Sequence, residues 1–223
     1  MDNYRIETTA AMQAADRLLS IEIASSNAAV EDALRVRHQV YAMERGYEQQ
    51  DARGIETDSY DVHSMHVLLR IRGCNTPIGA SRLILPRPGN NSFPMQDVCD
   101  ISTIGSVPLS TCGEVSRLSL IRTRGHLPPE AFVFSRLMLY RGLLAVTRAS
   151  GTTHWVAVME KVLIRLLAGA AINFKPFGPP VEYHGLRQPV WSDVEGVLSV
   201  MRKEQPATWA FVNGYDAPLT KFN

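Results

Sequence analysis

The sequence lacks most of the features that identify a protein class at sight. Its 223 residues include 3 cysteines, Cys74, Cys99 and Cys112, without C-x-x-C spacing, which argues against a disulfide framework and a zinc site. No serine-hydrolase, zinc-protease, P-loop or dinucleotide-binding motif occurs. No apolar run reaches the ~18 residues that a membrane span needs, since Arg165 interrupts the most apolar stretch.

The composition is that of an ordinary soluble globular protein, with 45% hydrophobic and 20% charged residues. Glycine and proline are dispersed, so no linker can be delimited, and the length predicts one large domain over residues 1–223. The first seven residues are acidic and lack the basic-then-apolar order of a signal peptide. These features predict a cytoplasmic protein without a transmembrane segment.

The net charge of +1 conceals an uneven distribution. Residues 115–175 carry nine basic and two acidic side chains, a local charge of +7, whereas the rest of the chain sums to −6. A basic region of this kind favours an acidic partner, such as a nucleic acid, an anionic cofactor or an acidic carrier protein. Arginines solvated on a helix surface are the alternative.

Hydrophobic periodicity predicts a mixed α/β chain, with a mixed sheet covered by helices. We expect strands at residues 20–25, 66–72, 77–85, 113–121, 152–159, 181–184 and 207–212. We expect helices at residues 28–45, capped by Asn27, at 128–148 and 160–172, and after the capping box Ser192-x-x-Glu195.

Several charged residues fall on inward positions of these elements. Arg37 lies on the apolar stripe of the first predicted helix, and Arg82 shares a strand face with Ile78 and Ile84. A buried guanidinium needs a partner, and the long loop at residues 46–61 is acidic. Glu114 and Arg117 are three residues apart, so a bulge between them is required to bring both to one side of the strand.

The spacing of these residues resembles that of the acyl-homoserine-lactone (autoinducer) synthases. The matching positions are Arg37, Tyr41, Tyr47, Asp58, Asp61, Arg82 and Glu114-x-x-Arg117. The phrases at residues 37–41, 60–64 and 114–118 look like the N-acyl amino acid synthases, and most closely like the acyltransferases associated with exosortase systems. The resemblance extends from about residue 35 to residue 120.

The resemblance implies a GNAT-like fold of the α/β (α+β) class, in which a mixed, mostly antiparallel sheet has helices on both faces. Such a sheet splays to admit the pantetheine arm of a thioester donor. Leu127 ends a loop that lacks the full coenzyme A signature, so acyl carrier protein is preferred over acyl-CoA as donor, with no tightly bound cofactor. The proposed carrier-binding residues are Arg122, Arg124, Arg136, Arg141 and Arg148. Nucleic-acid binding is not expected, because few aromatics are interleaved with this basic region.

The reaction implied is transfer of a long-chain fatty acyl group to an amine by direct attack on the thioester. Glu114 is the first candidate to orient or deprotonate the amine, and a structural ion pair with Arg37, Arg82 or Arg117 is an open alternative. His63 is an alternative base. The remaining substrate-binding candidates are Arg37, Tyr41, Tyr47, Asp58, Asp61, Arg82, Ser116 and Arg117.

Two further questions concern a metal and the acceptor. The D-x2-D-x-H-x2-H pattern at residues 58–66 lacks the helix or cysteine set that would support a metal site, so none is predicted. Tyr41 and Tyr47 stand where autoinducer synthases place phenylalanine and tryptophan, which favours an amino acid over S-adenosylmethionine as acceptor. An autoinducer synthase and a non-catalytic acyl-carrier or lipid-binding module are the alternatives.

Overall fold

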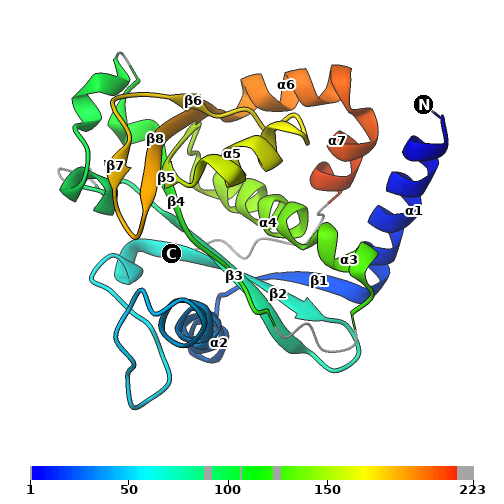
Figure 1. Cartoon of the computed structure of the whole chain (residues 1–223), viewed down its shortest axis with the longest axis horizontal. Helices are drawn as coiled ribbons and strands as arrows, with labels where there is room; N and C mark the ends of the chain where they lie inside the picture. The colour runs from blue at the N-terminus through cyan, green and yellow to red at the C-terminus, as the bar shows by residue number, and fades with distance from the viewer. Residues whose placement is uncertain (1, 88–91, 106, 123–126, 215–223) are drawn as a thin grey trace.

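A computed structural model describes residues 2–87, 92–105, 107–122 and 127–214 of the chain (Figure 1). The helices are α1 (Asp2–Leu18), α2 (Asn27–His38), α3 (Pro129–Val133), α4 (Ser135–Ser150), α5 (Lys161–Ala168), α6 (Val194–Glu204) and α7 (Pro206–Asn213). The strands are β1 (Leu19–Ile23), β2 (Ser64–Ile71), β3 (Thr76–Ile84), β4 (Cys112–Leu120), β5 (His154–Met159), β6 (Lys175–Pro176), β7 (Val181–Glu182) and β8 (Leu186–Asp193). No described helix has the length and hydropathy needed to cross a bilayer.

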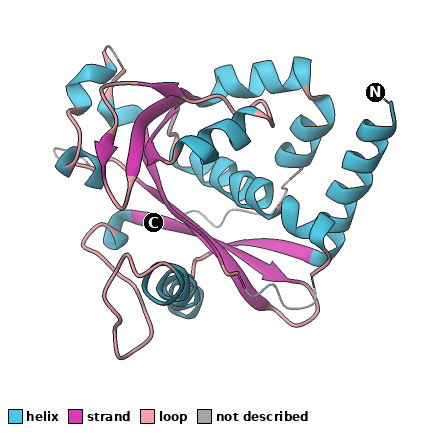
Figure 2. Cartoon of the chain, in the orientation of Figure 1, coloured by secondary structure: helices cyan, strands magenta, loops and turns pink. Residues whose placement is uncertain are grey.

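The strands form one twisted sheet in the order β1-β2-β3-β4-β5-β8-β6, with β7 paired to β8. Every described pairing is antiparallel except that of β4 with β5. Helix α2 covers one face, and α4 crosses the other against β1, β2 and β3 (Figures 1 and 2). The expected mixed, mostly antiparallel sheet with helices on both faces is confirmed.

Packing explains how closely the helices approach the sheet. The face under α4 holds the largest hydrophobic cluster, and a Cβ at Gly142 would lie 2.3 Å from Val67 Cγ1. Helix α2 packs through small residues, Ala29 and Ala33, on the opposite face. The sheet is therefore held between two layers of side chains, which fixes the positions of its polar residues.

The strands β4 and β5 separate along their length. Their parallel pairing comprises Cys112 with His154, Gly113 with Trp155 and Glu114 with Val156, and in the described chain it ends there. Strand β4 continues to Leu120 and β5 to Met159, so a gap opens in the sheet beyond Glu114. This is the splay that the resemblance implied.

Both ends of the chain differ from expectation. Helix α1 was not predicted, and residues 207–212 form helix α7 where a strand was expected. Pro206 suits the first turn of a helix, and the buried residues Thr208, Phe211 and Val212 have helical spacing. The helical period is hard to recognise in the sequence because the neighbouring residues are also apolar.

Two helix caps and one strand also differ from the sequence-based expectation. Ser26 rather than Asn27 caps α2, and α6 begins after Asp193 without a side-chain cap, so the capping box at Ser192 does not form. The eight-residue strand β8 was missed because Pro189 weakens its strand signal, although β8 pairs with β5 along its length.

Candidate active site

A β-bulge in β4 shapes the site. Arg82 pairs with Ser116 and Ala80 with Ser119, so Arg117 and Leu118 together oppose the single residue Ser81. Arg117 adopts φ +54°, a left-handed conformation uncommon for a residue with a side chain. A bulge is therefore present, but it consists of Arg117 and Leu118 and does not lie between Glu114 and Arg117 as expected. It turns Arg117 out of the regular alternation of the strand.

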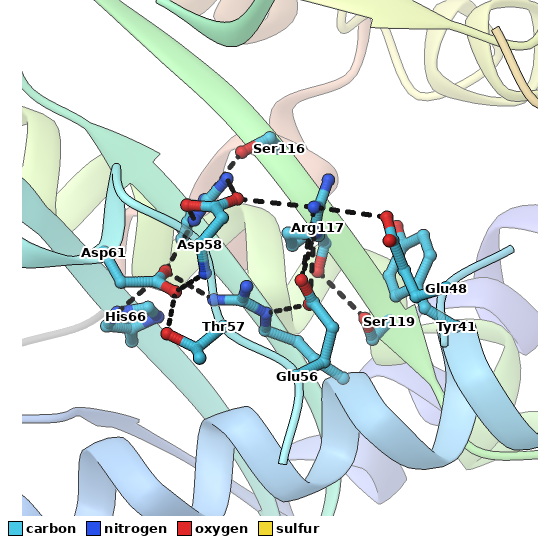
Figure 3. Close-up of polar contacts among 12 residues, drawn as sticks. Tyr41, Glu48, Glu56, Thr57, Asp58, Asp61, His66, Ser116, Arg117 and Ser119 are labelled. Carbon is cyan, nitrogen blue, oxygen red and sulfur yellow. Dashed lines mark hydrogen bonds and ion pairs between the residues drawn. The ribbon is translucent and has the colours of Figure 1, made fainter. Parts of the chain in front are cut away.

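Three arginines from three elements share carboxylate partners beside this bulge. Figure 3 shows Arg117 among these carboxylates. Arg37 of α2 and Arg82 of β3 have fully buried side chains, and that of Arg117 is 12% exposed. Their partners are carboxylates of the acidic loop that leads from α2 to β2, namely Glu48, Glu56, Asp58 and Asp61. The acidic loop at residues 46–61 therefore supplies the counter-charges of the buried arginines.

The contacts in this cluster are short and shared. Arg37 donates to Glu56 and to Asp61, each at 2.6 Å. Arg82 donates from Nη1 and Nη2 to the two oxygens of Asp58, at 2.7 and 2.6 Å. Arg117 reaches Glu56 at 3.1 Å and also contacts Glu48 and Asp58. Each arginine is thus fixed by at least two carboxylates, which matches the stringent pairing that buried charges require.

Glu56 was not among the predicted site residues. It is 7% exposed and bridges Arg37 and Arg117. The charge balance of the sequence could have indicated Glu56, because three inward arginines need more carboxylate partners than the two aspartates of the family spacing. With Glu48 included, four carboxylates face three guanidinium groups, and the cluster carries a net charge of −1.

The cluster predicts a specific loss of stability in acid. The arginines hold the pKa values of Glu56, Asp58 and Asp61 below their usual ranges, despite burial that opposes ionisation. Lowered pKa values stabilise the folded protein above the unfolded-state values near 4, and the gain is lost as pH falls through the folded-state values. Because the raised pKa of Glu114 acts in the opposite direction, the test uses Glu114→Gln as the parent protein. In it we expect the free energy of unfolding, measured by urea titration, to drop by about 2 kcal/mol or more between pH 6 and pH 3. Asp61→Asn should reduce this drop, and an unchanged drop would contradict the assignment.

Glu114 lies at the point where β4 and β5 separate. Its side chain is buried, and Oε2 accepts a hydrogen bond from the Met95 backbone N–H at 3.0 Å. Burial raises the pKa of Glu114 to about 7, although Met95, Arg82 and Arg117 act to lower it. Among the described residues Glu114 forms no ion pair, because the three arginines are engaged by the acidic loop. The structure therefore does not show the alternative in which Glu114 is their structural partner.

Two cavities meet beside Glu114. The smaller one, of about 80 Å³, is lined by Glu114, Met95, Tyr183 and His184 among others. The larger one, of about 230 Å³, lies in the gap and is mostly apolar, with Tyr140, Leu143, Trp155 and Phe174 in its wall. Both are lined by Tyr41, Val115, Ser116, Arg117, Val158 and Arg187, so these residues form a common wall.

The two predicted tyrosines are neighbours, with ring centres 6.2 Å apart, and of the two only Tyr41 lines these cavities. Residues Gln39–Glu44 form a π-helical turn at the end of α2, and this turn carries Tyr41 beneath the Arg117 guanidinium, 5.4 Å from the ring centre. Tyr47 stacks on His184 with ring centres 4.7 Å apart. Tyr183, His184 and Arg187 were not predicted as site residues. Tyr183 and His184 lie in a turn where a strand was expected, and Arg187 lies on β8, which was not predicted.

Of the remaining candidate residues, Ser116 lines the two cavities and His63 does not. Ser116 accepts a hydrogen bond from Arg82 at 3.0 Å and lines both cavities. The ring of His63 contacts Arg87 at 2.6 Å, and His63 is not among the residues that line these two cavities. Among the residues that can be described, no cluster of three or more His, Cys, Asp or Glu side chains is placed to hold a metal ion.

The predicted carrier-binding arginines divide into separate groups. Arg136 lines the larger cavity, and Arg122 is exposed near the end of β4. Arg141 is 7% exposed, pairs with Asp16 and stacks on Phe211, so it is not available to a docking partner. Arg148 is exposed and binds Asn213 at the end of α7, and Arg124 lies outside the described residues.

Comparison with known proteins agrees with this geometry. Residues 36–124, which include Arg37, Glu114 and Arg117, match the family model of the acetyltransferase (GNAT) domain. The match covers less than half of the chain, and together with the fold it makes the chain similar to the GNAT-fold acetyltransferases. No curated protein matches the chain significantly.

Solved structures extend the likeness beyond the matched segment. The acyl-homoserine-lactone synthase LasI aligns with a TM-score of 0.59 and 19% identity, over 78% of this chain and 87% of that one. BjaI, a CoA-dependent acyl-homoserine lactone synthase solved with SAM and isopentyl-CoA, gives 0.62 and 19%, over 83% and 88%. FeeM, an N-acyl amino acid synthase from uncultured soil microbes, gives 0.59 and 12%, over 82% and 93%. At these identities the likeness establishes the fold, and the exosortase association stays a prediction.

Proposed function

We propose that this enzyme transfers a fatty acyl group from the phosphopantetheine arm of acyl carrier protein to the amino group of an amino acid. The observation that carries the proposal is the position of Glu114, a buried carboxyl at the fork of β4 and β5 beside two adjoining cavities. The larger, mostly apolar cavity suits the thioester and its acyl chain, and the smaller cavity, which is lined by Glu114, suits the amine.

The chemistry needs an amine freed of its extra proton and held against the thioester carbon. A carboxylate with a pKa of about 7 accepts that proton near neutral pH, whereas an ordinary glutamate is too weak a base. The edge of β4 that faces the gap beyond Glu114 has no strand partner among the described residues, so its backbone N–H groups are our candidates to stabilise the oxyanion.

A covalent acyl-enzyme is not part of the proposal. Burial raises the pKa values of the Cys99 and Cys112 thiols to about 11, which leaves both protonated near neutral pH. The amine therefore attacks the thioester directly, and the carrier thiol leaves with a proton.

The choice of acyl carrier protein over acyl-CoA rests on charge. The region at residues 115–175 has a net charge of +7, and of its arginines Arg136 lies at the wall of the larger cavity. An acidic carrier would be steered toward this region at low ionic strength.

A product analysis tests the proposal. Purified protein is incubated with dodecanoyl acyl carrier protein or dodecanoyl-CoA, a mixture of amino acids and S-adenosylmethionine, and the products are identified by mass spectrometry. We expect an N-acyl amino acid, formed faster from the carrier-bound donor. An acyl-homoserine lactone would replace this proposal by an autoinducer synthase, and binding of the acyl carrier without any product would replace it by a binding module.

The pH dependence of the reaction gives a second test. If Glu114 acts as the base, only its ionised form is active, and this form is lost as pH falls below its raised pKa. We expect kcat/KM to be level above about pH 7 and to fall about tenfold per pH unit well below it. A profile that stays level down to pH 5 would remove Glu114 from the role of base.

A further inference from the structure

A group of charged residues outside the acidic cluster spans the mouth of the gap. Arg45, which follows the π-helical turn, and Arg187 of β8 both contact Oε1 of Glu160, at 3.3 and 3.2 Å. Glu160 directly follows β5 and its side chain is 43% exposed. Two guanidinium groups therefore share a single carboxylate oxygen, and the group carries a net charge of +1.

Arg187 is held in place by its own hairpin. Residues His184 and Gly185, with φ of +51° and +95°, form the turn between β7 and β8. The turn directs the carbonyls of Tyr183 and His184 at the guanidinium, which donates to them from Nε and Nη2. The guanidinium also lies 5.9 Å from the Tyr47 ring centre. In the described part of the chain, no group accepts a hydrogen bond from Nη1.

Arg187 differs in this respect from Arg117, the other arginine in the common wall. Arg117 is shared by three carboxylates, Glu48, Glu56 and Asp58. Arg187 has one carboxylate partner, which it shares with Arg45, and its side chain is 13% exposed. Of these two arginines, Arg187 is the one with capacity to bind an anion that enters the cavity.

The charged groups near the small cavity favour one orientation of an acceptor bound there. Glu114 and Arg187 both line this cavity, whereas Arg45 and Glu160 line the larger one, and the group of Arg45, Arg187 and Glu160 carries a net charge of +1. An α-amino acid has a basic nitrogen and a carboxylate on the same carbon. Its nitrogen would approach Glu114 while its carboxylate approaches Nη1 of Arg187, an arrangement that charge-assisted hydrogen bonds favour.

We infer that Arg187 binds the carboxylate of the acceptor and thereby restricts the enzyme to amines that carry one. This inference rests on the proposed acyl transfer to an amine. Arg187 is a substrate-binding residue in this scheme: Nη2 keeps its contact with Glu160, and Nη1 is left for the acceptor. A simple amine of the same side chain would fit the cavity but would offer no carboxylate to Nη1.

The experiment compares acceptors in the dodecanoyl transfer assay. Phenylalanine and phenethylamine differ by the carboxylate alone, as do alanine and ethylamine, and each pair is assayed with the wild type, Arg187→Met and Arg187→Lys. Arg202→Met is the matched control, because Arg202 also lies over an aromatic ring, that of Trp209, and is remote from both cavities.

We expect the wild type to prefer the amino acid by about tenfold or more in kcat/KM, the effect of a charge-assisted hydrogen bond. Arg187→Met should remove this preference, chiefly by raising the KM for the amino acid, and Arg187→Lys should restore part of it. Equal transfer to acid and amine by the wild type would overturn the inference and leave the proposed function intact.

A binding measurement separates the inference from the proposed function. Calorimetry with N-dodecanoylalanine and N-ethyldodecanamide compares products with and without the carboxylate, and it requires no turnover. We expect the wild type to bind the carboxylate form about tenfold more tightly, and folded Arg187→Met, checked by its melting temperature, to bind both alike. Absence of acyl transfer to every amine would reject the proposed function, whereas equal binding of the two products would reject the role of Arg187.

Discussion

Replacing Glu114 by glutamine is expected to lower kcat for acyl transfer by about 10²- to 10⁴-fold, the usual contribution of a general base. Glutamine keeps the size of the side chain and can still accept the Met95 N–H hydrogen bond, but it has no basic oxygen. Steady-state kinetics with the acyl donor at saturation measures the effect. Glu204→Gln, at the exposed end of α6, is the control.

The same substitution should stabilise the protein at alkaline pH. Burial raises the pKa of Glu114 from an ordinary 4.5 to about 7, so ionisation of the folded protein is penalised. A raised carboxyl pKa favours folding below about pH 4.5 and opposes it increasingly as pH rises to 7. Above pH 7 the ionised carboxylate costs up to about 3 kcal/mol, which glutamine avoids.

If Glu114→Gln lowers the activity but raises the free energy of unfolding, Glu114 acts as a base and not as a structural residue. If urea titration at pH 8 showed Glu114→Gln to be less stable than the wild type, Glu114 would be a partner of the arginines. Unchanged activity together with higher stability would leave Glu114 without a role in the reaction.

The second large effect is expected at Arg37. Arg37→Met removes the fully buried guanidinium between Glu56 and Asp61 and leaves two carboxylates short of a partner. Removing one member of a buried ion pair typically costs about 3–5 kcal/mol, because the remaining charge stays desolvated. We expect a loss in this range in the free energy of unfolding at pH 7, measured by urea titration.

Arg35→Met provides the matched control for that experiment. Arg35 lies two residues earlier on α2, and its side chain is 53% exposed in a pair with Glu31. Exposed pairs contribute about 0–1 kcal/mol, so this variant should remain close to the wild type. A similar loss for both variants would mean that α2 tolerates methionine poorly, and that the buried network contributes little.

The sequence predicted a structural feature correctly where a physical requirement of one residue could be met in only one way. A guanidinium on the apolar stripe at Arg37 needed a carboxylate, and a Glu-x-x-Arg strand needed a bulge, and both features are present, with the bulge further along the strand than expected. The strands expected at residues 66–72 and 77–85 are present as the antiparallel pair of β2 and β3. Which carboxylates would pair was not predictable, because Asp51 and Glu56 of the same loop look alike in sequence. Asp51 is bound to exposed Arg53, whereas Glu56 is buried.

The carboxyl-terminal third of the chain was harder to predict. Trp209 and Phe211 suit a strand as well as a helix, and only the contact of α7 with α4 and α6 decides between them. The sequence did not indicate Arg187 as a site residue, because Arg187 lies on a strand that was not predicted and its position depends on the preceding turn. Its place in the site follows from packing between segments far apart in the sequence.

The separation of β4 and β5 also creates two internal strand edges within a folded sheet. Past Glu114, each strand has an edge without a strand partner in the described chain, and such edges can recruit strands from other molecules. Helix α5 and the hairpin of β7 and β8 contribute to the cavity walls beside these edges. The walls that shape the substrate site therefore also shield the sheet from intermolecular β-pairing, so loosening them to admit larger substrates would increase the risk of aggregation.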